Sequence, residues 1–108
     1  MKFLIAIFAS LFFALPAMAV DISMGSNGSL IFEPSEISIS AGEIIRFVDG
    51  EGPPHNIIVE GRADLSREAL MFNPGDSQDI KFADAGDYDF FCGHHHGAGM
   101  AGTIHVSQ

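Results

Sequence analysis

Short apolar or alternating stretches, separated by turn-forming residues at regular intervals, run through most of this sequence. Strands of this length with frequent turns are typical of a β-sandwich, and 108 residues are enough for one domain. We therefore predict an all-β fold, a single Greek-key β-sandwich of about 7–8 short strands with one short helical turn within 61–70. The expected strands are 29–33, 36–40, 44–48, 56–60, 77–82, 88–92 and 102–106.

Residues 1–19 have the pattern of a secretory signal peptide. Lys2 supplies a positive start, an apolar run covers 3–15, and small residues precede a cleavage position after Ala19. The run is short for a membrane-spanning helix. We predict that cleavage leaves an exported domain over 20–108, without stable membrane insertion.

The chain is strongly acidic, with 14 Asp and Glu residues against 5 Lys and Arg, which gives a formal net charge of −9. Loss of 1–19 removes Lys2 as the only charged residue and leaves −10. Such a charge repels nucleic acid and anionic lipid and attracts basic partners. We expect a monomer that binds no nucleic acid.

Cys92 is the only cysteine, and it opens a glycine-rich segment with metal-binding side chains. His95 follows three residues later, Met100 five residues after that, and His55 offers a second imidazole upstream. Two imidazoles, a thiolate and a weak axial thioether form the donor set of a blue-copper electron-transfer site. Soft sulfur favours Cu(I) and imidazole accepts both oxidation states, so little has to move when an electron arrives or leaves.

Simpler explanations exist for each residue alone. A lone cysteine is often a small buried hydrophobe, and the histidine run 94–96 can be a solvated, adventitious metal binder. The spacing of Cys92, His95 and Met100, together with the upstream His55, favours a copper site over both of these explanations. Zinc is the main rival metal, but structural zinc sites usually use two or more cysteines, and catalytic ones do not use methionine.

Several stretches resemble the cupredoxins, and most closely the plastocyanin family. The resemblance covers most of 29–107. It is carried by the copper-loop pattern in 86–92, His95 and 97–100, by the early strands in 31–37, and by the first-ligand segment 54–57.

The resemblance implies one copper ion, Cu(I)/Cu(II), as cofactor, bound by His55, Cys92, His95 and Met100. It also implies that Asn56 holds the cysteine loop through hydrogen bonds. His95 alone lies at the family's spacing from the cysteine. His94 and His96 stand where the family often has proline and a polar residue. They are either solvated or contribute to metal uptake or pH sensitivity.

The surface that would meet a partner departs from the family pattern. Phe91 stands where plastocyanins usually carry a tyrosine used in docking. Strand alternation points its side chain away from the core, either exposed or covered by a loop. The segment that carries much of the family's acidic patch is shortened here. Glu60, Asp64 and Glu68 are the candidates to replace part of it.

We therefore predict a soluble type 1 copper protein that shuttles single electrons. We do not expect an enzyme, because the protein fills all four ligand positions and catalytic copper needs an open one. The resemblance implies cytochrome f and photosystem I as partners in a thylakoid lumen. The bacterial counterpart is a pseudoazurin-like periplasmic chain, with a cytochrome-type donor and an oxidase or reductase acceptor. The alternative function is copper trafficking or storage in the periplasm, which the histidine run and Met100 favour.

Overall fold

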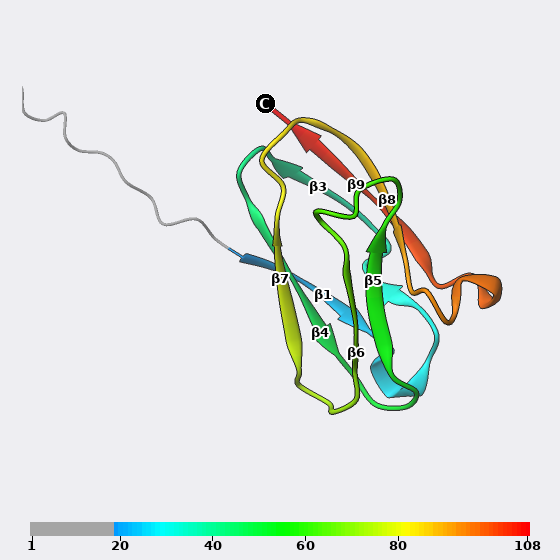
Figure 1. Ribbon diagram of the computed structural model, residues 1–108. Helices are drawn as coiled ribbons and strands as arrows, with labels where there is room; N and C mark the ends of the chain where they lie inside the picture. The colour runs from blue at the N-terminus through cyan, green and yellow to red at the C-terminus, as the bar shows by residue number, and fades with distance from the viewer. Residues whose placement is uncertain (1–18) are drawn as a thin grey trace, which may run out of the picture.

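The computed structural model describes residues 19–108, which form two packed β-sheets and two single-turn 3-10 helices (Figure 1). The first sheet has the order β2-β1-β4-β7, with β1 (Ala19–Met24), β2 (Phe32–Glu33), β4 (Ile44–Asp49) and β7 (Ser77–Lys81). The second has the order β3-β9-β8-β5-β6, with β3 (Glu36–Ser40), β5 (His55–Val59), β6 (Arg67–Met71), β8 (Gly86–Phe91) and β9 (Ala101–Ser107). The helices are η2 (Ser26–Gly28) and η3 (His96–Ala98). The predicted all-β sandwich is confirmed.

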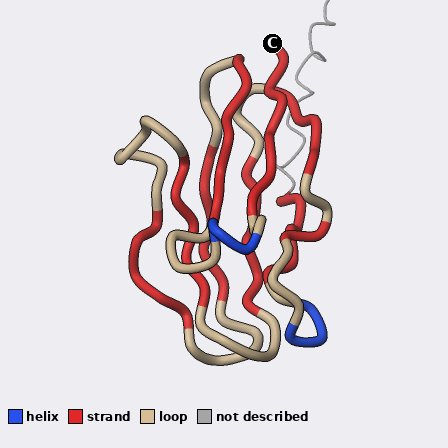
Figure 2. The backbone as a smooth tube through the Cα atoms, turned by 90° about the vertical axis from the view of Figure 1, so that its right-hand side faces the viewer, coloured by secondary structure: helices blue, strands red, loops and turns tan. Residues whose placement is uncertain are grey.

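Alternation along the strands places one apolar face of each sheet against the other, as the two layers in Figure 2 show. In β4, Ile45 and Phe47 are fully buried while Arg46 between them is exposed. Aromatic rings join the layers at the centre. Phe90 of β8 packs edge-to-face on Phe32 of β2 at 4.7 Å between ring centroids, and on Phe47 at 5.5 Å.

The pairing of β5 with β8 determines which loops meet. The two strands are antiparallel, with Ile58 opposite Phe91. The start of β5 and the end of β8 therefore lie at the same end of the sandwich. His55 begins β5 and Cys92 directly follows β8, so the fold brings these two residues together from distant parts of the sequence.

Two elements near the start of the domain differ from the sequence prediction. β1 was not predicted, because its first residue, Ala19, was assigned to the signal peptide. Ile22 and Met24 are fully buried, and the strand lies parallel to β4. The expected strand 29–33 is reduced to β2. The signal-peptide prediction for 1–19 falls almost wholly on residues outside the described range and stays a prediction.

The helical turn expected within 61–70 is only a hydrogen-bonded turn. The amides of Leu65 and Ser66 both donate to the carbonyl of Arg62, and β6 then begins at Arg67. The residues of β6 are good helix formers, but pairing with β5 overrides that weak preference. The Arg67 guanidinium also donates to the carbonyls of Leu65 and of Asp79 in β7, which connects the edges of the two sheets.

Among residues 19–108, the structure contains no helix with the length and apolarity that crossing a membrane requires.

His105 joins three strands of the second sheet. Its Nδ1 lies 2.8 Å from a carboxylate oxygen of Asp87 on β8, and its Nε2 lies 2.8 Å from one of Glu36 on β3. A histidine can donate from both ring nitrogens only when it is protonated. The hydrogen bond with Glu36, and then that with Asp87, raise the pKa of His105 above its ordinary value.

We predict that His105→Gln reduces stability in a pH-dependent way. A raised folded-state pKa gives stabilisation that is complete below the unfolded pKa of about 6.5 and is lost as pH rises through the folded pKa. The difference in free energy of unfolding between the unchanged apoprotein and the His105→Gln apoprotein should therefore be largest near pH 6 and become smaller as the pH rises. Urea unfolding across this range measures it, with exposed His94→Gln as control. A difference that does not change with pH would contradict the ion-pair interpretation.

Candidate metal centre

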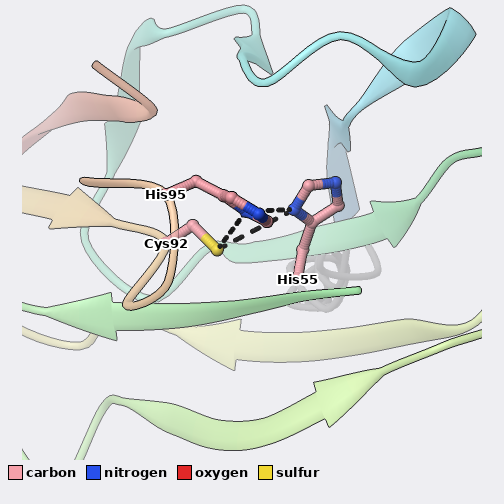
Figure 3. A group of neighbouring side chains, drawn as sticks. All are labelled: His55, Cys92 and His95. Carbon is pink, nitrogen blue, oxygen red and sulfur yellow. Dashed lines mark hydrogen bonds between the residues drawn. The ribbon is translucent and has the colours of Figure 1, made fainter. Parts of the chain in front are cut away.

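Three donor atoms converge at the end of the sandwich where β5 starts and β8 ends (Figure 3). The sulfur of Cys92 lies 3.4 Å from Nδ1 of His95 and 3.8 Å from Nδ1 of His55. The two Nδ1 atoms are 3.2 Å apart. One thiol and two imidazole nitrogens thus face one another.

Backbone hydrogen bonds close the loop after β8, from which Cys92 and His95 face His55. The amide of His95 donates to the carbonyl of Cys92 at 3.1 Å, and the amide of Met100 donates to the carbonyl of His95 at 3.2 Å. The amide of Cys92 donates in turn to the carbonyl of Met100 at 3.1 Å. The side chains of Cys92 and Met100 are fully buried, while His95 is half-buried.

The electrostatics of the cluster suit metal binding. Burial, and to a smaller degree the nearby His95, lower the pKa of His55. His55 therefore stays neutral near pH 7, which is the form that binds a metal. With both imidazoles turned toward one buried thiol, the donor set fits copper or zinc, and the softness of sulfur favours copper among the redox-active metals.

Asn56 connects the two halves of the site, as the resemblance implied. Its Oδ1 accepts a hydrogen bond from the amide of Gly93 at 2.8 Å, and its Nδ2 donates to the carbonyl of Glu68 on β6 at 3.0 Å. One buried side chain therefore ties the cysteine loop to β5 and β6. Since Asn56 neighbours His55, the same contacts restrain both segments that supply donors.

The remaining histidines of the run lie outside the cluster. His94 is exposed, and the ring of His96 stacks on Phe91 at 4.3 Å between centroids and 18° between planes. Phe91 is half-buried, and the residue that stacks on it, His96, belongs to the loop between β8 and β9. A groove of about 330 Å³ lies beside this stack, with the carboxylates of Glu60 and Asp89 in its wall.

Sequence reasoning missed the contact behind His55. Its Nε2 is buried and has no hydrogen-bond partner within 19–108, and it lies against the backbone of Gly25. A glycine after a strand is normally a turn signal, so nothing in the sequence alone marked Gly25 as part of the site.

The sequence profile of the family described as "Copper binding proteins, plastocyanin/azurin family" matches residues 18–107. The chain belongs to this family. The match includes all four residues expected as ligands and every described residue except Gln108.

Individual relatives agree with this assignment. The chain is 42% identical over 96 residues to a plastocyanin of Scenedesmus fuscus, covering 81% of this chain and 98% of that one. It is 38% identical over 114 residues to chloroplastic plastocyanin B of Populus nigra, covering 95% and 68%. Among solved structures, oxidised plastocyanin of Dryopteris crassirhizoma has a TM-score of 0.73 at 29% identity, covering 82% of this chain and 100% of that one. Amicyanin of Paracoccus versutus has a TM-score of 0.68 at 30% identity, covering 86% and 85%.

These relationships confirm a plastocyanin-like cupredoxin with one type 1 copper ion as its cofactor. They also confirm the prediction of a blue-copper electron carrier. The alternative of copper trafficking or storage is not favoured.

We predict that Asn56→Ala weakens both the fold and the metal loop. Two hydrogen bonds are lost, which should lower the free energy of unfolding of the apoprotein by roughly 1–2 kcal/mol. The affinity for Cu(II) should decrease as well, because the cysteine loop loses its attachment to β5. Asn73→Ala removes the same amide from an exposed turn and should change stability by less than about 0.5 kcal/mol. Equal effects of the two substitutions, in urea unfolding and copper titration, would show that Asn56 has no special role.

Proposed function

We propose that this chain holds one copper ion between His55, Cys92, His95 and Met100 and uses it to pass single electrons between redox proteins. The observation that supports the ligand set most strongly is the convergence of one buried thiol and two imidazole Nδ1 atoms within 3.8 Å of one another. Met100 is proposed as the fourth ligand, because its side chain is fully buried and its backbone is hydrogen-bonded to both Cys92 and His95.

Bound copper supplies one-electron chemistry by alternating between Cu(I) and Cu(II). The protein's part is to keep the donors in place in both states. His55 is held by strand β5, and Cys92 by the Asn56 bond to the following amide. The backbone bonds between 92 and 100 hold His95 and Met100. Such a rigid set needs little rearrangement, which favours fast electron transfer.

His95 is the proposed point of electron entry and exit, because it is the only half-buried residue of the four. Small and apolar residues surround this end, so a partner can approach closely and leave quickly. This apolar collar consists of Pro53, Pro54, Gly97, Ala98 and Gly99.

A second contact area is proposed at the groove beside Phe91. Glu60 and Asp89 give its wall negative charge, which complements a basic redox partner. Of the other two candidate acidic residues, Glu68 is exposed, whereas Asp64 is ion-paired with Arg62 at 2.8 Å. Because Arg62 neutralises Asp64, the net negative charge that Glu60, Asp64 and Glu68 give this surface is less than that of three carboxylates.

The proposed compartment is outside the cytoplasm, either a thylakoid lumen or a bacterial periplasm. The signal-peptide pattern of 1–19 supports export, and several relatives are named as chloroplastic plastocyanins. Cytochrome f and photosystem I are the partners proposed for a lumen, and a cytochrome with a periplasmic oxidase or reductase for a bacterium. We propose a carrier and not an enzyme, since protein residues fill all four ligand positions.

We predict that Cys92→Ser abolishes the intense visible absorption of the Cu(II) protein. The hydroxyl of serine is too hard and too weakly acidic to replace the thiolate, so both the sulfur-to-copper band and the reversible potential should be lost. His105→Gln should keep both, because His105 lies on β9 among Glu36 and Asp87. A normal blue spectrum from the Cys92 variant would overturn the ligand assignment.

We predict that the rate of association with a basic cytochrome decreases as salt increases, because screening shortens to about 8 Å at physiological ionic strength. Glu60→Gln should lower the rate at low salt by up to about fivefold, since one charge pair 4 Å apart is worth about 1 kcal/mol in water. Glu33→Gln removes an equal charge from an exposed position on β2 and should have a smaller effect. Stopped-flow kinetics that show equal effects would argue against docking at the groove.

A further inference from the structure

The backbone at Gly25 lies directly against the ring of His55, and a side chain at this position would clash with the ring. Gly25 has φ +75°, and its Cα faces the far edge of the imidazole. A Cβ at this position would lie under 3.0 Å from Nε2, closer than real Cβ atoms approach, and 3.1 Å from Cδ2. Only glycine therefore allows the chain to pass this close to the ring.

Gly25 is itself fixed from the other side. The amide of Gly50, after β4, donates to the carbonyl of Met24 at 2.7 Å. A Cβ on Gly50 would lie 2.7 Å from the carbonyl oxygen of Gly25 and 2.9 Å from that of Met24. The amide of Gly25 also donates to the carbonyl of Ile31 at 3.0 Å. The peptide behind His55 thus cannot move away from the ring without breaking these contacts.

We propose that Gly25 is a positioning residue for the copper site. The backbone of Gly25, which carries no Cβ and is held by Gly50, determines the position and orientation of the His55 ring. Nδ1 of His55 is thereby directed toward Cys92 and His95. The proposal rests on the proposed function in one respect, namely that His55 is a copper ligand. Groups that orient a metal-binding histidine commonly affect metal affinity by about 10–100-fold.

The chain offers a matched control three residues away. Gly28 has φ +79°, almost the same backbone conformation, but a Cβ there would meet nothing within 4 Å among the described residues. Alanine at either position carries the same penalty for a left-handed conformation. A Cβ on Gly25 would also lie 3.1 Å from the carbonyl oxygen of Ser29. The contact with the ring is therefore reported by the part of the difference between Gly25→Ala and Gly28→Ala that disappears when the His55 ring is removed.

The first test needs no copper. Urea unfolding of the apoproteins gives the cost of each alanine with His55 present and with His55→Ala. We expect the cost of Gly25→Ala to decrease when the ring is removed and the cost of Gly28→Ala to stay the same. If Gly25→Ala alone does not fold, we expect the double variant with His55→Ala to fold. A cost of Gly25→Ala that is independent of the ring, or a double variant that also fails to fold, would overturn the proposal.

The second test uses copper. Competition with a chelator should show a decrease in Cu(II) affinity of at least about tenfold for Gly25→Ala and an unchanged affinity for Gly28→Ala. Equal affinities of the two variants would contradict the positioning role. Full affinity in the single variant His55→Ala would instead overturn the ligand assignment, while the unfolding measurements would still report the contact between Gly25 and His55.

Discussion

The packing of Phe90 against Phe32 and Phe47 is the interaction on which the metal centre depends. The rings of Phe32 and Phe47 belong to the first sheet, and their centroids lie 4.7 Å and 5.5 Å from that of Phe90 in the second sheet. They fix β8, and β8 pairs with β5. Cys92, two residues after Phe90, and His55, at the start of β5, are then brought face to face by the core. The site is preorganised because two of its buried residues, His55 and Cys92, lie at the ends of paired strands.

The half-buried His95 and the buried Met100 are held differently. His95 and Met100 lie on a loop that is closed by its own backbone hydrogen bonds to Cys92. Asn56 is the side chain that joins this loop to the strands. Asn56 thus connects the strands that position His55 and Cys92 to the loop that carries His95 and Met100.

Much of this arrangement could be predicted from the sequence. The spacing after Cys92 pointed to His95, and the structure places its ring beside the sulfur while His94 is exposed. Alternation predicted most strands because burial of one face is a local property of the sequence. β6 was missed because pairing with β5 overrode helix-forming residues, and β1 because its start overlapped the expected signal peptide. Gly25 was missed because its role comes from a contact with His55 that only the folded chain creates.

The ligand set of the copper ion can be measured by copper K-edge X-ray absorption on the oxidised protein, loaded with one equivalent of Cu(II). We expect one short copper–sulfur distance and two copper–nitrogen distances, from Cys92, His55 and His95, with any Met100 sulfur contribution weak and long. A first shell of nitrogen and oxygen alone, as expected if exposed His94 and His96 held the metal, would contradict this ligand set.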